Sequence, residues 1–207
     1  MVGEHTTVVA AVGLLLITSG CMGVLSDGTS SFGADPVEPR NEDLRNAGYE
    51  QTSAQSTNES RTVRIGGQDR DVVLTNVFRT YERTVDDGSV SEITLYATPV
   101  IELDGETVNP VDEWSDQRLA DHVSQRYDDV QLGDIENRQN HRSLGENTEL
   151  LRYSGAATLD GQRTPVTVHV TTLRDDGDVV VGVAVHPQSA SDEPATVATI
   201  LGGLFRP

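Results

Sequence analysis

Five two-residue turn signals constrain the possible folds of this chain more than any other feature. Glycine follows glycine or aspartate in IGGQ, DDGS, LDGE, LDGQ and DDGD, which occupy residues 65–68, 86–89, 103–106, 159–162 and 175–178. Gly-Gly and Asp-Gly pairs tolerate the positive φ angles that a two-residue β-hairpin needs at both turn positions. We therefore expect a sheet whose strands mostly run antiparallel and are joined by tight turns.

The segments between these turns have the residue pattern of strands. Apolar and polar residues alternate over 93–98, and valines alternate with polar residues over 166–171. Such alternation predicts strands with one buried face. The run VVVGVAV at 179–185 is apolar on both faces. We therefore expect this run at the centre of the sheet, covered on both sides.

One helix is predicted after the third turn signal. Ser115 can cap a helix that begins at Asp116, and apolar residues continue at helical spacing as far as Tyr127. Trp114 precedes the cap and is expected to pack on Leu119 as a hydrophobic staple. The alternative role for this single tryptophan is to stack on a ligand.

A second helix completes the expected fold. The segment ATVATILGGLF at 195–205 has an apolar stripe at helical spacing, and residues 41–49 can form a short helical turn. The expected fold class is therefore α+β. It is a mostly antiparallel β-sheet meander of six to eight strands, flanked by one long helix and a C-terminal helix. We expect residues 44–207 to form a single globular α+β domain.

The N-terminal segment indicates where the protein resides. Residues 6–17 are almost wholly apolar, but a membrane-spanning helix needs ~20 residues. They are typical of a secretory signal peptide, predicted here as residues 1–20. Small residues then precede Cys21, the single cysteine, as at a site where a lipoprotein signal peptide is cut and the thiol receives a lipid. The alternative is an N-terminal hydrophobic helix that holds a buried free cysteine.

The segment 21–43 is predicted to be a lipidated, flexible tether. It is rich in Ser, Gly and Pro and has few apolar residues. Such a segment cannot bury enough surface to fold. The expected partner of Cys21 is the membrane, through its lipid. The expected location is the cell surface, on the outer face of the cytoplasmic membrane.

The charge of the chain indicates the conditions under which it works. The formal net charge is −18, and all 15 basic residues are arginines. At molar salt the Debye length falls to ~3 Å, so carboxylates cease to repel one another and remain as a hydrated coat. An acidic chain without lysine is therefore expected from a halophile. Its negative charge also disfavours nucleic acid as a partner.

The residues that could carry chemistry are dispersed along the chain. His122, His141, His169 and His186 lie in separate predicted elements, without the spacing of a metal site. The sequence has no serine nucleophile elbow, and its glycine pairs do not precede helices. We therefore predict no catalytic residue, no metal and no cofactor. Asn58 begins an Asn-Glu-Ser sequon and is a possible N-glycosylation site.

Several longer segments follow one another in a recognisable order. VVLTNVFRTYERTV, SDQRLADHVSQRYDDV and RYSGAATLDGQ occur together with the more specific TPVIELDGETVNP and GVAVHPQ. Over about residues 44–204 this pattern resembles an uncharacterised lipoprotein family of haloarchaea, known only as a domain of unknown function. The resemblance implies a secreted, lipid-anchored cell-surface protein without an assigned activity. A weaker resemblance, of fold alone, is to the Mog1/PsbP-like sandwich, in which helices flank an antiparallel sheet.

These features predict a non-catalytic module at the surface of a halophilic archaeon, with an unknown protein or small molecule as its partner. The alternative is an extracellular hydrolase whose site is assembled from residues distant in the sequence. A deep pocket that gathers His122, His141 or His186 with carboxylates would favour the hydrolase. An open groove or an exposed apolar patch would favour the binding module.

Overall fold

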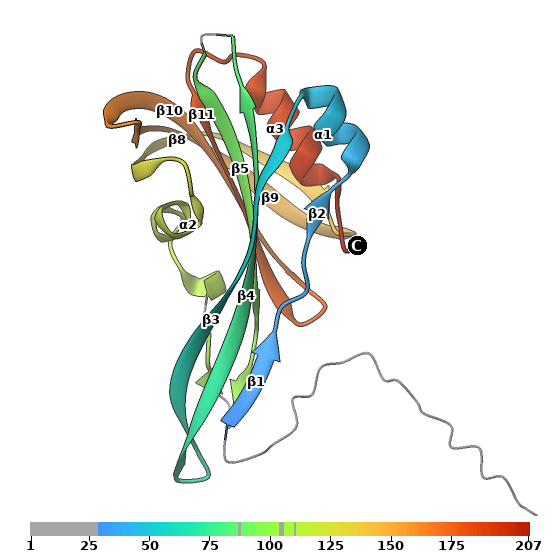
Figure 1. Cartoon of the computed structure of the whole chain (residues 1–207), viewed down its shortest axis with the longest axis vertical. Helices are drawn as coiled ribbons and strands as arrows, with labels where there is room; N and C mark the ends of the chain where they lie inside the picture. Colours follow the sequence, from blue (N-terminus) through green and yellow to red (C-terminus); the bar gives the residue numbers. More distant parts are fainter. Residues whose placement is uncertain (1–28, 87, 104–105, 110) are drawn as a thin grey trace, which may run out of the picture.

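A computed structural model of the chain describes residues 29–207, except for 87, 104–105 and 110. Its centre is one eight-stranded sheet, against which three α-helices pack (Figure 1). In chain order the elements are β1 (Thr29–Gly33), β2 (Glu38–Pro39), α1 (Asn41–Ala47), β3 (Glu50–Ile65), β4 (Gln68–Thr84), β5 (Val90–Pro99), β6 (Glu102–Leu103), β7 (Glu106–Thr107), the 3₁₀ turn η1 (Val111–Glu113), α2 (Asp116–Val123), β8 (Asp128–Ser143), β9 (Glu146–Leu159), β10 (Gln162–Asp175), β11 (Asp178–Pro187), α3 (Glu193–Gly202) and β12 (Leu204–Phe205).

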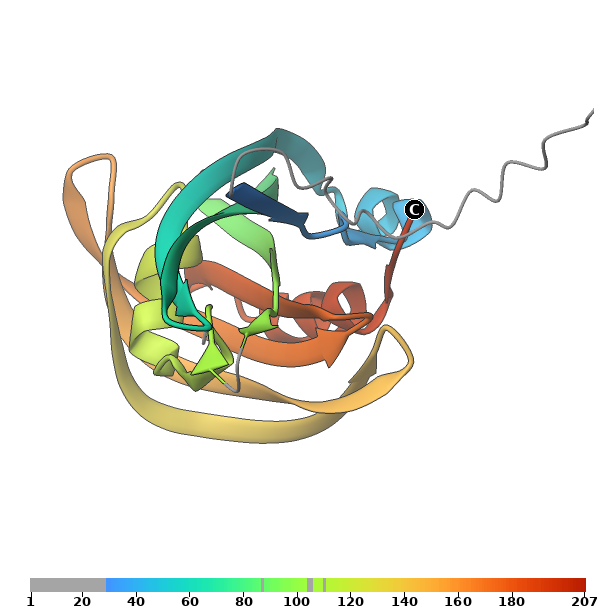
Figure 2. The same ribbon diagram turned by 90° about the horizontal axis from the view of Figure 1, so that it is seen from below.

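The strands of the large sheet lie in the order β3-β4-β5-β11-β10-β9-β8. Each neighbouring pair on this path is antiparallel. β1 lies beside β4, on the edge opposite β3, and runs parallel to it, which makes the sheet mixed. Figure 2 shows how strongly the sheet curls, with β3 and β4 arching on one side and β8 and β9 on the other.

The predicted turns join consecutive strands. Positive φ angles occur at both central residues of the turns that link β3 to β4, β9 to β10 and β10 to β11. The signals at 86–89 and 103–106 also separate consecutive strands, although part of each lies outside the described residues. A further tight turn, Leu144-Gly145 between β8 and β9, has φ angles of 52° and 87°. The sequence does not signal this turn, because leucine rarely adopts a positive φ.

The central strands are buried on both faces. All ten residues of β11 are buried, as the run VVVGVAV predicts. β5 and β10 are also buried on both faces over most of their length, so the prediction of one buried face for them is wrong. The cause is tertiary, because α2 packs on one face of these strands and α3, together with α1, packs on the other.

The predicted fold class, α+β with a mostly antiparallel meander flanked by one long helix and a C-terminal helix, is also wrong. The structure is a β-rich fold in which most described residues belong to strands of a mixed sheet. The three α-helices have only seven, eight and ten residues. At 1.5 Å of rise per residue, helices of about two to three turns cover only part of a sheet whose long strands have 14 to 17 residues.

The helix α2 begins where predicted and ends about one turn early. The Ser115 hydroxyl accepts a hydrogen bond from the backbone N–H three residues on, at 3.3 Å, as an N-cap does. After Val123, the N–H groups of Gln125 and Arg126 donate to the buried carboxylate of Glu92. In a longer helix these groups would donate to helix carbonyls, and the Glu92 carboxylate would lose its two backbone donors. A tertiary contact therefore ends the helix.

Regular structure begins earlier in the chain than predicted. The prediction that residues 21–43 form a flexible tether is wrong from residue 29 onward. β1 pairs with residues 71–75 of β4, and β2 pairs with β12 near the C-terminus. β5 covers β4 only from residue 77, so without β1 this part of the β4 edge would lack backbone partners. The predicted signal peptide 1–20 and Cys21 lie outside the described residues. Within residues 29–207, as far as described, no helix is long and apolar enough to cross a membrane.

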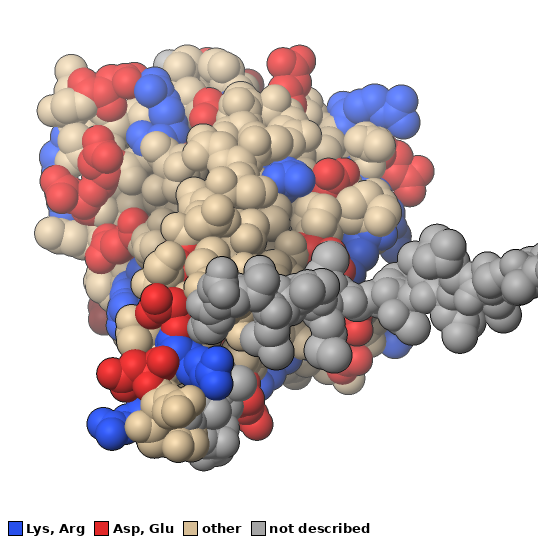
Figure 3. All heavy atoms as spheres, turned by 60° about the horizontal axis from the view of Figure 1, so that its bottom comes forward, with Lys and Arg blue, Asp and Glu red and all other residues tan. Residues whose placement is uncertain are grey.

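Charged side chains of both signs share the surface. On the face shown in Figure 3, acidic and basic atoms lie interspersed among neutral ones. Several arginines are paired with carboxylates, among them Arg206 with Asp175 at 2.6 Å. The more exposed pairs, such as Arg138 with Glu149, contribute little to stability. The fully buried acids Glu92 and Glu193 are different, because each needs specific partners in the interior.

Candidate functional site

The structure brings two of the four predicted histidines together and separates the other two. His169 on β10 and His186 on β11 are 2% and 1% exposed, and their Nε2 atoms lie 3.1 Å apart. His122 is exposed on α2, and its ring contacts that of Trp114 with centroids 5.2 Å apart. His141 is half-buried on β8. The buried pair is therefore the one histidine cluster within the described part of the chain.

Burial keeps both rings of the pair uncharged at neutral pH. Desolvation, with the charges of His186 and Arg152 as smaller causes, lowers the pKa of His169 to about 3. Desolvation also lowers the pKa of His186, whose Nδ1 lies 3.0 Å from the carbonyl oxygen of Pro187. The pair can thus donate and accept hydrogen bonds, but it carries no charge in the interior.

A buried ion pair anchors the start of α3. The carboxylate of Glu193 accepts a hydrogen bond from the Tyr49 hydroxyl at 2.9 Å and pairs with Arg83. Arg83 also donates to the carbonyl oxygen of Ala47 at 3.0 Å and lies 3.5 Å from Asp192. Each charged group of this network has partners, so the network fastens α3 to α1 and β4.

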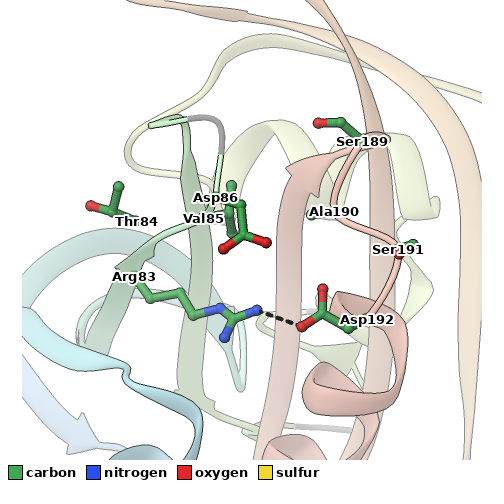
Figure 4. A pocket seen from close by; sticks show the side chains of 8 residues that line it. All are labelled: Arg83, Thr84, Val85, Asp86, Ser189, Ala190, Ser191 and Asp192. Atoms are coloured by element: carbon green, nitrogen blue, oxygen red, sulfur yellow. Dashed lines mark hydrogen bonds and ion pairs between the residues drawn. The ribbon is translucent and has the colours of Figure 1, made fainter.

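A hollow of about 170 Å³ opens beside this ion pair (Figure 4). It is lined by residues 83–86 at the end of β4 and by residues 189–192 ahead of α3. Figure 4 shows Arg83 reaching across it toward Asp192. Because the Arg83 guanidinium is already bonded to protein groups, it has little capacity for a ligand. We therefore do not assign the functional site to this hollow.

A larger cleft of about 520 Å³ lies between α3 and the strands β8, β9 and β10. This α3 cleft is lined by Asn137, Gln139, Leu150, Arg152, His169, Pro194, Ala195, Ala198 and Thr199. The strands contribute two amides, a guanidinium and an imidazole, whereas the helix contributes mainly small apolar side chains. A cleft of this size and mixed lining suits a small organic molecule.

Two residues that line the α3 cleft each carry one buried polar atom without a hydrogen-bond partner among the described residues, namely Nδ1 of His169 and Nε of Arg152. The two residues are direct register partners across β10 and β9, so their side chains lie on one face. Arg152 Nε lies 3.5 Å from the carboxylate of Glu136, and this ion pair leaves Nε without a hydrogen bond. Since buried polar atoms are nearly always hydrogen-bonded, the two atoms mark the α3 cleft as the candidate binding site.

The remaining predicted site residues lie apart from this cleft. Cys21 lies outside the described residues. Asn58 is exposed on the edge strand β3, where its side-chain oxygen accepts a hydrogen bond from the Thr75 hydroxyl at 2.9 Å. In the described ranges no three His, Cys, Asp or Glu side chains are placed to hold a metal ion.

Trp114 packs against the apolar cluster under α2, which includes Leu119, as the staple prediction expects. The Arg118 guanidinium lies 3.7 Å from the centre of the Trp114 ring and covers one face. That face is therefore unavailable for the alternative role of stacking on a ligand.

Sequence reasoning missed Arg152 and the contact between His169 and His186. A signal for each exists, because Arg152 shares a strand face with the buried Leu150, and His169 occupies the face opposite the valines of β10. Polar groups at inward positions of buried strands indicate a site. Their meeting depends on the registers of the hairpins β9-β10 and β10-β11, which the pattern of a single strand does not specify but the two-residue turns at 160–161 and 176–177 do.

One match emerges from comparison with known proteins. A family model described as a domain of unknown function covers residues 36–204. No curated protein and no solved structure matches the chain. The expectation of an uncharacterised family is thus confirmed, whereas the haloarchaeal lipoprotein identity and the likeness to Mog1/PsbP-like sandwiches stay predictions.

Proposed function

We propose, from the premise that this chain belongs to the DUF6517 family of domains of unknown function, that it is a non-catalytic module which binds a small polar molecule in the α3 cleft. The observation that carries the proposal is the pair of buried, unpartnered atoms on two residues that line that cleft, His169 Nδ1 and Arg152 Nε. A buried polar atom without a partner costs about 1–3 kcal/mol. A ligand that bonds both atoms would remove this cost.

Binding is favoured over the alternative of hydrolysis by the chemistry of the histidine pair. A general base works best when its pKa lies near the working pH, and the pKa of His169 is lowered to about 3. The ring nitrogens of the pair contact each other and the Pro187 carbonyl, apart from the unpartnered Nδ1. Among the described residues, no serine or threonine hydroxyl is bonded to either ring, so the pair has no activated nucleophile there.

The proposal includes a location outside the cell. After removal of the signal peptide 1–20, a lipid on Cys21 would hold the module on the outer face of the cytoplasmic membrane of a halophilic archaeon. The support is the apolar run before a single cysteine, and a net charge of −18 without lysine.

A lipid on Cys21 would also orient the module. Thr29 follows Cys21 by eight residues, and an extended chain of that length reaches at most ~28 Å. The end of the sheet where β1 begins would therefore stay near the membrane. In Figure 1, α3 lies toward the opposite end of the long axis, so its cleft would be held away from the lipid surface.

The binding function is tested by what the cleft retains. The Cys21→Ser chain, folded in molar KCl, is incubated with the small-molecule fraction of a cell extract and washed, and bound compounds are identified by mass spectrometry. Ala195→Trp fills the cleft from the exposed side of α3, and Thr196→Trp is the control outside the cleft lining. We expect a compound that the parent and the Thr196 variant retain and the Ala195 variant loses. Retention that does not depend on Ala195→Trp, or no retention, would contradict the proposal.

The location is tested by partitioning and by salt. The parent chain should fractionate with membranes or detergent, whereas Cys21→Ser should be released or left unprocessed. Equal partitioning of both would exclude the lipid anchor. The melting temperature should rise steeply from low to molar KCl, because salt screens the repulsion among carboxylates. A melting temperature independent of salt would contradict the halophilic origin.

A further inference from the structure

The hydrogen bonds of the histidine pair determine which nitrogens carry protons. His186 Nδ1 faces the carbonyl oxygen of Pro187 at 3.0 Å, and a carbonyl only accepts, so this Nδ1 carries the proton. In a neutral ring Nε2 is then an acceptor, and His169 Nε2, 3.1 Å away, must donate to it. The remaining nitrogen, His169 Nδ1, therefore presents a lone pair. It is this buried atom that has no partner.

Arg152 supplies the opposite chemistry beside this acceptor. Its guanidinium is always protonated and offers only donors, and its Nε–H is buried without a hydrogen bond. The carboxylate of Glu136, 3.5 Å away, is about half exposed and ion-pairs with Arg152 without completing that bond. A partly exposed pair of this kind contributes little stability, so a ligand anion can replace it.

We propose that the ligand of the α3 cleft is a small 2-hydroxy carboxylate. Its carboxylate binds the guanidinium of Arg152, and its neighbouring hydroxyl donates a hydrogen bond to Nδ1 of His169. The proposal rests on the proposed function of the cleft and specifies the class of its ligand.

The spacing of the two protein groups supports a ligand with adjacent functions. Arg152 and His169 are direct partners in the antiparallel register, and such partners have Cβ atoms ~4.5–5.5 Å apart. A hydroxyl on the carbon next to a carboxylate can address both residues at once. Beside the polar lining residues, the cleft also has the apolar side chains of Leu150, Pro194 and Ala198, which suit a short aliphatic chain.

Other simple ligands can bond only one of the two protein groups, the Arg152 guanidinium or His169 Nδ1. Chloride and a plain carboxylate can pair with Arg152, but they have no proton to donate to His169. An uncharged alcohol can donate to His169 and leaves the guanidinium without an anion. An amino acid would place an ammonium group beside the Arg152 cation, which like-charge repulsion disfavours.

The experiment compares three probes of nearly equal size. Glycolate has both the carboxylate and the hydroxyl, methoxyacetate has the hydroxyl proton replaced by methyl, and glycolamide has no charge. Each is titrated into the Cys21→Ser chain in molar KCl by calorimetry, and the imidazole ¹⁵N resonances are followed by NMR. We expect glycolate to bind about tenfold more tightly than either analogue. We also expect glycolate alone to shift the Nδ1 resonance of His169.

Matched variants assign the binding to the two residues. Arg152→Gln should weaken glycolate about tenfold or more, because it removes a charge-assisted hydrogen bond. Arg138→Gln is the control, since Arg138 is exposed on β8, lies 3.6 Å from Glu149 and does not line the cleft. His169→Leu should make glycolate and methoxyacetate bind equally. If either variant fails to fold by circular dichroism, the probe series on the Cys21→Ser chain decides.

The possible results separate this proposal from the proposed function. Equal binding of glycolate and methoxyacetate would overturn the hydroxyl contact with His169, and equal binding of glycolate and glycolamide would overturn the carboxylate contact with Arg152. Failure of all three probes, alongside another compound whose retention depends on Ala195→Trp, would overturn the ligand class and leave the binding function standing. Absence of any such compound would overturn both.

Discussion

The two faces of the central strands β10 and β11 are buried equally but differ in chemistry. The face under α2 consists of valines, at positions 166, 168, 170, 179, 181, 183 and 185. The face under α3 carries His169, Thr171, Gly182, Ala184 and His186, among other residues. The same two strands, read at alternate positions, thus form an apolar core on one side and the floor of a polar site on the other.

This difference separates stability from binding. Valine side chains need only close packing, whereas each buried polar atom needs a hydrogen-bond partner. On the α3 face, His169 Nδ1 and Thr171 Oγ1 have none. On the α2 face the buried carboxylate of Glu92 is bonded to two backbone N–H groups. On β10 and β11 the α3 face thus carries unsatisfied polar atoms, whereas the α2 face of the same two strands consists of valines.

Val183→Asp should have the largest effect. The carboxylate would be buried among valines on β11 without a partner, and an uncompensated buried charge costs about 3–5 kcal/mol. Chemical denaturation in molar salt measures the loss. Ile135→Asp is the control, because Ile135 is 40% exposed on β8 and its replacement should change stability by less than about 0.5 kcal/mol. Equal losses at both positions would break the distinction between core and surface.

The two faces should also respond to pH in opposite directions. Burial raises the pKa of Glu92 from 4.5 to about 7, so its contribution is present below pH 4.5 and is lost as pH rises through 7. The lowered pKa of His169 gives a contribution that is present above pH 6.5 and is lost as pH falls toward 3. For Glu92 the loss is about 3 kcal/mol by linkage.

Glu92→Gln isolates the response of the α2 face. In this variant the unfolding free energy should not fall between pH 5 and 8 through titration at position 92. It should still fall at acid pH, through His169. Denaturation at a series of pH values measures both. The exposed control Glu146→Gln should keep the parent profile. A parent-like alkaline loss in Glu92→Gln would assign that loss to another group.

Gly182→Ala tests how closely α3 packs against the α3 face of β10 and β11. An added Cβ would lie 3.0 Å from methyl groups of both Leu201 and Thr171, so these side chains must give by a few tenths of an ångström. Overpacking of this kind costs about 1–3 kcal/mol, and thermal unfolding measures it. Gly33→Ala is the control, since its Cβ would meet only Thr75, at 3.6 Å. An unchanged melting temperature for Gly182→Ala would mean that the contact can relax.

The smallest expected effect is a gain in stability. Thr171→Val removes a buried hydroxyl that has no partner and should stabilise the protein by about 1 kcal/mol. The same change at Thr98, on the α2 side, should destabilise it, because the Thr98 hydroxyl donates to Asn76 at 2.7 Å. Chemical denaturation of both variants measures the two changes in unfolding free energy. Destabilisation by both would mean that Thr171 is satisfied by water.

The local features of the fold follow from the sequence alone. The turn at Asp160-Gly161 has positive φ at both residues because these residue types tolerate it. The central place of β11 follows from its unbroken apolar run, and the start of α2 follows from the capping hydroxyl of Ser115. Each of these depends on interactions within a few residues, and composition or spacing records such interactions directly.

Contacts between residues distant in the sequence decided the remaining features of the fold. The parallel contact of β1 with β4 and the end of α2 at the Glu92 carboxylate depend on partners distant in the sequence. The position of α3 beside the candidate site has the same origin. Arg152 and His169 become neighbours only when β9 pairs with β10 in one register, and β11 then brings His186 to His169. The two-residue turns at Asp160-Gly161 and Asp176-Gly177 fix these two registers. What only the tertiary structure decided is that α3 packs beside this face and forms the α3 cleft with β8, β9 and β10.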